Sequence, residues 1–450
     1  MYGRSVGGLL AIPAMLAMVI GVIWWAGRNV EVAAALPVMV VLMVLTVPLV
    51  LRAVAAQEDP VIRRVILLLF PLKILAALAR YYIAFEVYGG QADAALYHDN
   101  GILLAQSFRE GVFAVDTGRG NLSTGAVRYV TGLLYAGAGP TIIGAFMVWA
   151  WLAAWGQYGF LRGFQIALPD GNHRRYAVLV LLLPSMLYWP SSLGKESLVV
   201  AGLGLAVAGA GRVYAGQVRG LPFLLAGLTL TAVIRPHVGL IAATALVMGY
   251  VLKGIRSRST GGRPLNPVVF VLGAAVLIAA FFPLVSTAQN FLGLDAEDGD
   301  TTTQIQEVLE FRGGQTETGG SEFSPVVVNS PLRLPAGAFT VLFRPMPNEA
   351  RNLLQLATSL ESLMLLVLAL RWLRPLQLPG RISRQPMLLA AVVFVLAFVV
   401  AFSIMGNFGI LARQRVQVLP WLLMLLCAYA PGRSETSKPG DSPVQAAHQS

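Results

Sequence analysis

The feature that most constrains this chain is a series of apolar runs, each about as long as a membrane-crossing helix. Roughly 20 consecutive apolar residues are needed to cross the hydrocarbon core of a bilayer as a helix. Such runs include 7–26, 32–51, 65–85, 267–286 and 386–405. The first run is long and lacks a clear small-residue cleavage motif, so we interpret it as a span and not as a cleaved signal peptide.

Composition points to the same class of protein. Apolar residues make up 56% of the 450 residues and charged residues 12%, against about 45–50% and about 25% in soluble domains. The sequence therefore predicts an all-α, polytopic membrane protein. Its single cysteine, Cys427, excludes a disulfide framework within the chain.

We divide the chain into about 12 transmembrane helices. The predicted spans are 7–26, 32–51, 65–85, 128–155, 176–189, 197–214, 221–234, 238–252, 267–286, 352–370, 386–405 and 416–430. They form one transmembrane domain, 1–431, with long connections at 86–127 and 287–351 and a polar tail, 432–450, that we expect to be disordered. Within the first connection, 102–113 predicts a short amphipathic helix on the membrane surface.

The distribution of basic residues predicts the orientation, because short cytoplasmic loops are rich in Lys and Arg. With the N-terminus inside, the inner face has 19 basic and five acidic residues, and the outer face has 13 basic and 16 acidic residues, with Arg80, Arg128 and Arg212 near the ends of spans counted on the face that they adjoin. Both termini are then cytoplasmic. The net charge of +11 is thus a signature of topology, and we expect no nucleic-acid partner.

This orientation brings five polar segments to the outer face. They are GGQADAALYHDNG at 89–101, WPSSLGKES at 189–197, IRPH at 234–237, FRPMPNE at 343–349 and NFGILARQR at 407–415. Two spans beside them, 176–189 and 221–234, have only 14 residues, about 21 Å of helix against about 30 Å of hydrocarbon. We expect them to end below the outer surface, where charged residues line a protein-enclosed cavity.

The first segment offers a candidate catalytic acid. Asp93 is interpreted as a general base or a metal ligand, and the alternative is a helix N-cap before Ala-Ala-Leu. Tyr97 shares a helical face with Asp93, whereas His98 and Asp99 do not.

The other segments supply candidate binding residues for an anion. Lys195, Glu196, Arg235 and His237 either contact an anionic ligand or stabilise helix ends. For Arg413 and Arg415 the alternative is plain surface charge.

The last candidates are a charged pair, Arg344 and Glu349, and a divalent metal. Arg344 and Glu349 either join the site or pair with each other in a structured loop. A divalent metal is possible, but no ligand spacing indicates one, and the acidic stretch 295–300 resembles a calcium loop only loosely. The chain has no phosphate-binding P-loop, Rossmann glycine pattern or GxSxG motif.

On these residues the chain resembles the GT-C superfamily of integral-membrane glycosyltransferases, including the O-antigen polymerase-like proteins. The resemblance rests on an Asp in a long outer loop, in ADAALYH, and on basic residues of the same face. The segments WPSSLGKES, IRPH and NFGILARQR also look like those of bacterial polysaccharide-biosynthesis membrane proteins. Asp93 follows the third predicted span instead of the first, and no adjacent acidic pair accompanies it.

The resemblance implies an enzyme of the bacterial cytoplasmic (inner) membrane. It implies transfer of a sugar or saccharide from a polyprenyl-(di)phosphate carrier to a saccharide, lipid or glycan acceptor outside the cytoplasm, in cell-envelope polysaccharide synthesis. Asp93 would then be the base, and Tyr97 and His98 would orient a substrate. Lys195, Arg235, Arg413 and Arg415 would contact the phosphate, and Glu196, His237 and Arg344 would complete the site.

Two other functions fit the same residues. A transporter or flippase of lipid-linked saccharides would bind the phosphate without performing chemistry on it. A noncatalytic subunit of an envelope-assembly complex would need none of the polar residues individually.

Overall fold

The structure is a computed structural model. It describes residues 27, 30–90, 92–118, 120, 122–259, 321–372, 380, 382 and 384–429. Four predicted segments lie outside the described residues. They are the spans 7–26 and 267–286, the part of the connection 287–351 that precedes residue 321, and the tail 432–450.

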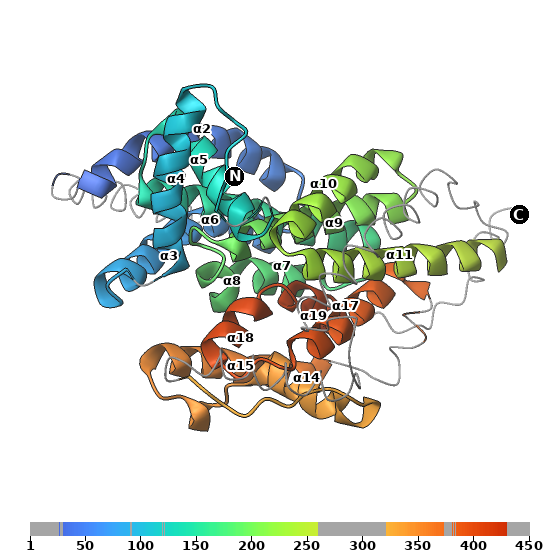
Figure 1. Ribbon diagram of the computed structural model, residues 1–450. Coiled ribbons are helices and arrows are strands. Elements are labelled where there is room, and N and C mark those ends of the chain that lie inside the picture. Colours follow the sequence, from blue (N-terminus) through green and yellow to red (C-terminus); the bar gives the residue numbers. More distant parts are fainter. Residues whose placement is uncertain are drawn as a thin grey trace, which may run out of the picture.

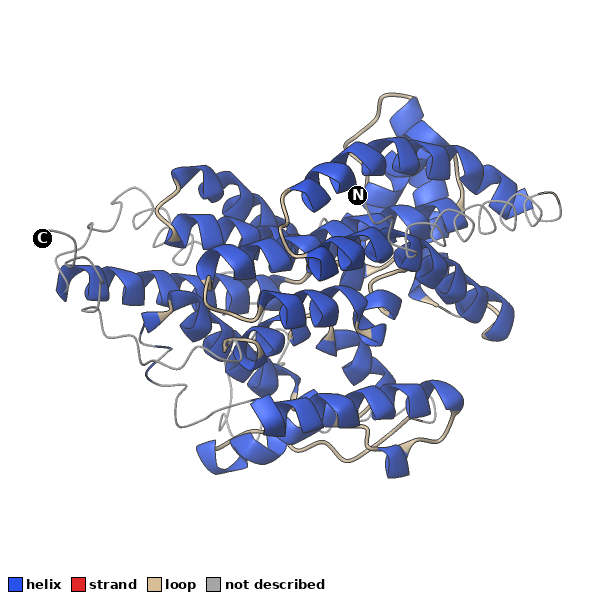
Figure 2. Ribbon diagram, turned by 180° about the vertical axis from the view of Figure 1, so that it is seen from behind, coloured by secondary structure: helices blue, strands red, loops and turns tan. Residues whose placement is uncertain are grey.

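The regular secondary structure of the described part is helical, with loops and turns between the helices and one isolated bridge between Glu322 and Asn407. The longer helices are α2 (Val30–Ala55), α3 (Pro60–Tyr82), α4 (Asp93–Arg109), α5 (Thr124–Ala138), α6 (Ile142–Ala167), α9 (Lys195–Tyr214), α10 (Leu221–Ile234), α11 (Pro236–Ser259), α15 (Leu353–Trp372) and α17 (Pro386–Phe402). The shorter ones are α7 (His173–Leu182), α8 (Pro184–Tyr188), α14 (Leu334–Phe343), α18 (Phe408–Arg415) and α19 (Leu419–Leu426). Figure 1 shows α2, α4 and α5 at one edge and α14 and α15 at the other, an arrangement that the reverse view in Figure 2 repeats.

Helix α9 lies at the centre because its glycines let two neighbours approach closely. Gly204 and Gly211 face the backbone of Gly156 and Gly163 on α6, and Gly202 and Gly209 face the backbone of α10. A Cβ at any of these α9 positions would collide with backbone atoms. Small residues at this spacing are typical of packed membrane helices. The glycine-rich sequence of 202–211 therefore fixes α9 between α6 and α10.

Four helices in the described part are long and apolar enough to cross a membrane, or five if one bent pair counts as a span. They are Val30–Ala55, Lys195–Tyr214, Pro236–Gly254 and Leu353–Trp372, and the bent pair is Thr124–Ala138 with Ile142–Ala167. Many apolar side chains of α2 and α15 are exposed, including Val44, Leu51, Leu360 and Leu370. Exposed apolar faces of this extent are typical of surfaces that meet lipid or a partner.

Several predicted spans are divided into shorter helices. The predicted span 128–155 is α5 and α6, which meet at an angle of 115°. The predicted span 176–189 is α7 and α8, because Pro184 follows Leu183 in an extended conformation. The run 416–430 contains the short helix α19. By contrast, the predicted 14-residue helix 221–234 matches α10.

The amphipathic helix expected at 102–113 is the second half of a longer helix, α4. Leu104, Ala105 and Phe108 are buried, and Leu96 and Leu103 are exposed. A Cβ at Gly132 of α5 would touch Leu104 and Phe108. The helix therefore packs on α5 along its length, and this packing holds its N-terminal residue, Asp93, in place.

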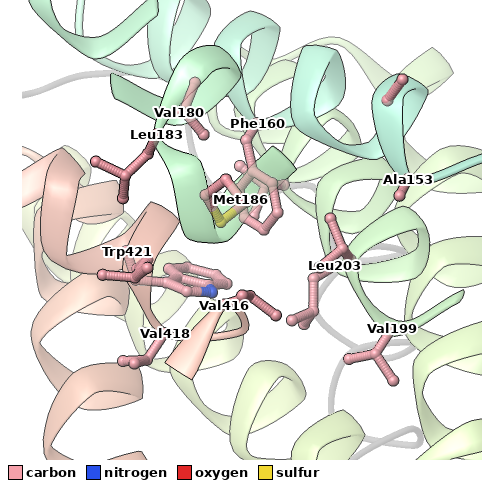
Figure 3. Close-up of a cluster of buried hydrophobic side chains, with 14 of the residues drawn as sticks. Ala153, Phe160, Val180, Leu183, Met186, Val199, Leu203, Val416, Val418 and Trp421 are labelled. Atoms are coloured by element: carbon pink, nitrogen blue, oxygen red, sulfur yellow. The ribbon is translucent and has the colours of Figure 1, made fainter. Parts of the chain in front are cut away.

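A buried apolar cluster joins the central helices to the C-terminal ones (Figure 3). Trp421 of α19 stacks on Phe394 of α17 at 4.5 Å between ring centroids and meets Phe160 of α6 edge-on at 6.2 Å. Met186 of α8 lies in the same cluster. This packing places α18, which directly precedes α19, next to the start of α9.

Candidate functional site

Asp93 is the first residue of α4 and does not cap it. The N-cap is Ala92, and no side chain caps the helix. The Asp93 carboxylate instead accepts a hydrogen bond from Arg413, with 3.3 Å between Oδ2 and Nη1. Its side chain is 61% exposed, so one face of the carboxylate is open to an incoming molecule.

Glu196 is in the first turn of α9, and its carboxylate lies between Arg235 and Arg413. Its Oε1 is 2.5 Å from Nη2 of Arg235 and 3.1 Å from Nε of Arg413. The Glu196 side chain is 7% exposed. A carboxylate this buried needs cationic partners, and Glu196 therefore fixes both guanidinium groups. We name Asp93, Lys195, Glu196, Arg235 and Arg413 the charged cluster.

The break between α10 and α11 delivers Arg235. Its backbone leaves the helical conformation, with φ of −143° and ψ of 89°, because Pro236 follows and begins α11. Gln414 of α18 accepts a hydrogen bond from Arg235. Gln417 in turn donates to Gln414 over 2.6 Å. The Arg235 guanidinium is thus held by Glu196 and by Gln414.

Lys195 donates a hydrogen bond to Ser123 Oγ at 2.9 Å. Ser123 has a φ of +56°, a conformation that costs a non-glycine residue about 1–3 kcal/mol. Its backbone N–H donates to the Val233 carbonyl over 2.7 Å. The chain before α5 is thereby joined to the end of α10, and Lys195 is held beside the junction.

Tyr97 is buried one helical turn after Asp93. Burial raises the pKa of Tyr97 to about 12, and the negative charges of Asp93 and Glu196 add to this effect. The phenol therefore stays protonated at neutral pH and can donate a hydrogen bond.

His98 is bound to the neighbouring helix. Its Nδ1 is 2.7 Å from the Tyr135 hydroxyl on α5. Burial lowers the pKa of His98 below its ordinary value of 6.5. Tyr97 therefore lies next to the charged cluster, whereas His98 contacts α5.

The two arginines of α18 point to different parts of the molecule. Asn407 caps the helix by accepting hydrogen bonds from Gly409 and Ile410. Arg413 joins the charged cluster, whereas Arg415 donates to the Val341 carbonyl at 3.2 Å and to Ser362 Oγ at 2.7 Å. Arg415 is therefore placed outside the cluster, where it ties α18 to α14 and α15.

Arg344 and Glu349 pair with each other, which is the second of the two expected alternatives. Glu349 also accepts a hydrogen bond from the Met346 N–H at 2.7 Å. The Arg344 guanidinium lies 4.7 Å from the Phe323 ring centroid and 5.2 Å from that of Phe408. The pair therefore packs against Phe323 and the first residue of α18.

His237 is in the first turn of α11, two residues after Arg235. Its ring lies 5.9 Å from the Phe402 ring, and the charges of Arg235 and Lys195 act on it. It is therefore a neighbour of the charged cluster on the side of α17.

Four residues around the site were not proposed as site residues from sequence: Arg80, Ser123, Ser192 and Gln414, although Ser192 and Gln414 lie in two of the predicted polar segments. Arg80, at the end of α3, has its guanidinium 4.9 Å from the Tyr188 ring and 5.1 Å from the Trp189 ring. A signal was available, because a lone arginine ends an apolar run just before the outer connection that holds Asp93. Ser123 carries no such signal, since its role depends on tertiary contacts.

The site combines an exposed carboxylate, a buried carboxylate and several fixed cations. Over the described ranges, no group of three or more His, Cys, Asp and Glu residues could hold a metal ion. The arrangement is suited to binding an anionic group and to accepting a proton next to it. Comparisons with protein families, with curated proteins and with solved structures found no match to this chain.

Proposed function

We propose that this protein is a membrane glycosyltransferase that transfers a sugar or saccharide from a polyprenyl-(di)phosphate carrier to an acceptor on the extracytoplasmic face. The observation that carries the proposal is the exposed Asp93 carboxylate, held within the charged cluster at 3.3 Å from Arg413. A general base and cations for a phosphate leaving group are the two functions that such a transfer requires.

The charges support a phosphate-bearing substrate. Lys195, Arg235 and Arg413, with Arg80 close to them, are four cations around two carboxylates, Asp93 and Glu196. Two positive charges are therefore in excess, which a phosphate or diphosphate would balance. The exposed apolar faces of α2 and α15 suit a protein that meets long hydrocarbon chains.

In the proposed reaction the acceptor hydroxyl attacks the anomeric carbon of the donor. A bond forms between the acceptor oxygen and this carbon, while the bond from the carbon to the phosphate oxygen breaks. Its electron pair leaves with the phosphate, and the proton of the hydroxyl passes to Asp93. Fixed cations stabilise the charge that develops on the phosphate. The protonated Tyr97 hydroxyl would orient one of the substrates.

The proposed setting is the cytoplasmic membrane of a bacterium, with the charged cluster on the outer side, both termini inside and about 12 spans. The basic residues of the predicted inner connections support this orientation. The acceptor would be a saccharide, lipid or glycan of the cell envelope.

The decisive experiment supplies the purified protein with polyprenyl-linked sugars and compares Asp93→Asn with wild type. The Asn side chain retains the size and a hydrogen-bond acceptor but loses the base, so turnover should fall about 10²- to 10⁴-fold. Donor binding should persist, since the phosphate contacts lie elsewhere. Asp99→Asn, an exposed position on the same helix, is the matched control and should leave turnover unchanged.

The same variants separate the enzyme from the alternatives. In a flippase, Asp93→Asn would leave transport of a lipid-linked saccharide in vesicles largely intact. In a noncatalytic subunit, the residues of the charged cluster would be individually dispensable. Full transfer activity of purified Asp93→Asn protein would disprove the role of Asp93 as the base.

A further inference from the structure

Arg80 differs from the arginines of the charged cluster in its partners. Its Nη1 and Nη2 approach only hydroxyl groups, those of Tyr188 and Ser192, each at 3.4 Å. Its Nε is buried and has no hydrogen-bond partner. Among the described residues, no carboxylate lies within ion-pair distance of Arg80. A guanidinium group placed in this way retains its capacity to bind an anion.

Lys195 is the second cation of this kind. Its ammonium group donates to Ser123 Oγ, and no acid within the described ranges pairs with it directly. An ammonium group has three donors, so one hydrogen bond to a hydroxyl leaves capacity for an anion. Lys195 is also the first residue of α9, whose N-cap, Gly194, supplies no side-chain capping bond.

Arg80 and Lys195 flank one short segment. Ser192, which contacts Arg80, lies three residues before Lys195. A Cβ at Gly194 would lie 3.9 Å from Ser192 Oγ and 3.3 Å from Glu196 Oε2, so this segment and the buried carboxylate are close together. The Tyr188 and Trp189 rings also pack against the Arg80 guanidinium.

The arginines of the charged cluster are already neutralised. Arg235 pairs with Glu196, and Arg413 pairs with both Glu196 and Asp93. An incoming phosphate would have to compete with these carboxylates for either guanidinium group. Removing a partner from a buried ion pair is costly, so these two arginines are better suited to positioning the acids.

We infer that the phosphate of an anionic lipid binds between Arg80, Ser192 and Lys195, and that Arg235 and Arg413 position Glu196 and Asp93 beside it. This inference rests on the proposed function, because it names the part of the same site that holds the carrier. Arg80 and Lys195 then bind the phosphate, whereas Arg235 and Arg413 position the two carboxylates.

The test measures binding of farnesyl phosphate and farnesyl diphosphate to the detergent-solubilised full chain, with farnesol as the neutral control. Arg80→Gln and Lys195→Gln should each weaken phosphate binding roughly 10- to 100-fold, the effect of losing one charge-assisted hydrogen bond. Arg80→Lys should recover part of the affinity because it retains the charge. Arg351→Gln, an exposed position outside the cluster, should bind like wild type.

Arg413→Gln tests the positioning role. It should reduce glycosyl transfer more than it reduces phosphate binding. The melting temperature of each variant shows whether it is folded. Wild-type affinity in folded Arg80→Gln protein would overturn the inference while leaving the glycosyltransferase proposal intact if transfer persists. Loss of binding in Arg80→Gln and Lys195→Gln, together with no transfer by wild type from any donor, would support the site and reject the reaction.

Discussion

At the scale of the residue, one buried carboxylate organises the candidate site. Glu196 contacts Arg235 and Arg413, and Arg413 reaches the exposed Asp93. Asp93, the proposed base, is therefore positioned by Arg413, which Glu196 holds in place. The substrate need not contact Glu196. Arg344 and Glu349 form a separate ion pair, which packs against Phe408 at the start of α18.

The pair of Arg344 and Glu349 predicts a dependence of stability on pH. Burial by itself would raise the pKa of Glu349, but hydrogen bonds from Arg344 and from the Met346 N–H outweigh it and lower the pKa below the ordinary value of 4.5. A lowered pKa in the folded state stabilises the protein at pH above 4.5, and this stability is lost as pH falls through the folded pKa.

The measurement is the melting temperature of wild type and Glu349→Gln between pH 7 and pH 3. Glu349→Gln should melt at a lower temperature at pH 7, and the difference should shrink as the pH falls through the lowered pKa of Glu349 and the wild-type carboxylate becomes protonated. A difference that stays constant across this range would contradict the assignment.

At the scale of the element, the position of α9 depends on its glycines. Gly204 faces the backbone of Gly156 so closely that no Cβ fits between the helices. Because α9 begins with Lys195 and Glu196, any shift of this helix against α6 moves two residues of the charged cluster. The packing of the helices and the geometry of the site are therefore linked.

Gly204→Val should separate α6 from α9 and destabilise the protein, by about 1–3 kcal/mol or more for overpacking. We expect a lower melting temperature in detergent together with weaker binding of farnesyl diphosphate. Gly137→Ala is the matched control, because a Cβ at that position of α5 meets no atom within 4 Å. Equal melting temperatures for Gly204→Val and wild type would contradict this view of the α6–α9 contact.

At the scale of the whole molecule, helix ends from distant parts of the chain meet at one place. The charged cluster combines the starts of α4 and α9, the break between α10 and α11 and the last turn of α18. If this face is extracytoplasmic, as proposed, the substrate meets the cluster outside the cytoplasm.

The proposed orientation can be tested with single cysteines introduced after Cys427 is replaced by Ala. A cysteine at 120 should react with a membrane-impermeant maleimide in intact cells. One at 258, in the basic C-terminal end of α11, should react only after the membrane is permeabilised. Labelling of position 258 in intact cells would reverse the map.

The apolar runs alone predicted that the described part of the chain is helical and that several of its helices are long enough to cross a membrane, since backbone groups in lipid must bond within their own helix. The 14-residue helix α10 was predicted with its observed bounds, because Arg235 and Pro236 end it in the sequence itself. The candidate base, Asp93, and the cations Lys195, Arg235 and Arg413 were also proposed from sequence, as charged residues next to apolar runs are costly and therefore conspicuous.

Only the tertiary structure decided which of these residues meet. It placed Arg413 at Asp93 and Arg415 at the Val341 carbonyl of α14, although the two arginines are two positions apart on one short helix. It also brought Arg80 and Ser123 to the start of α9 through packing between helices. Sequence reveals which residues are too polar for lipid, but the partner of each one depends on how the helices pack, because these contacts join residues far apart in the chain.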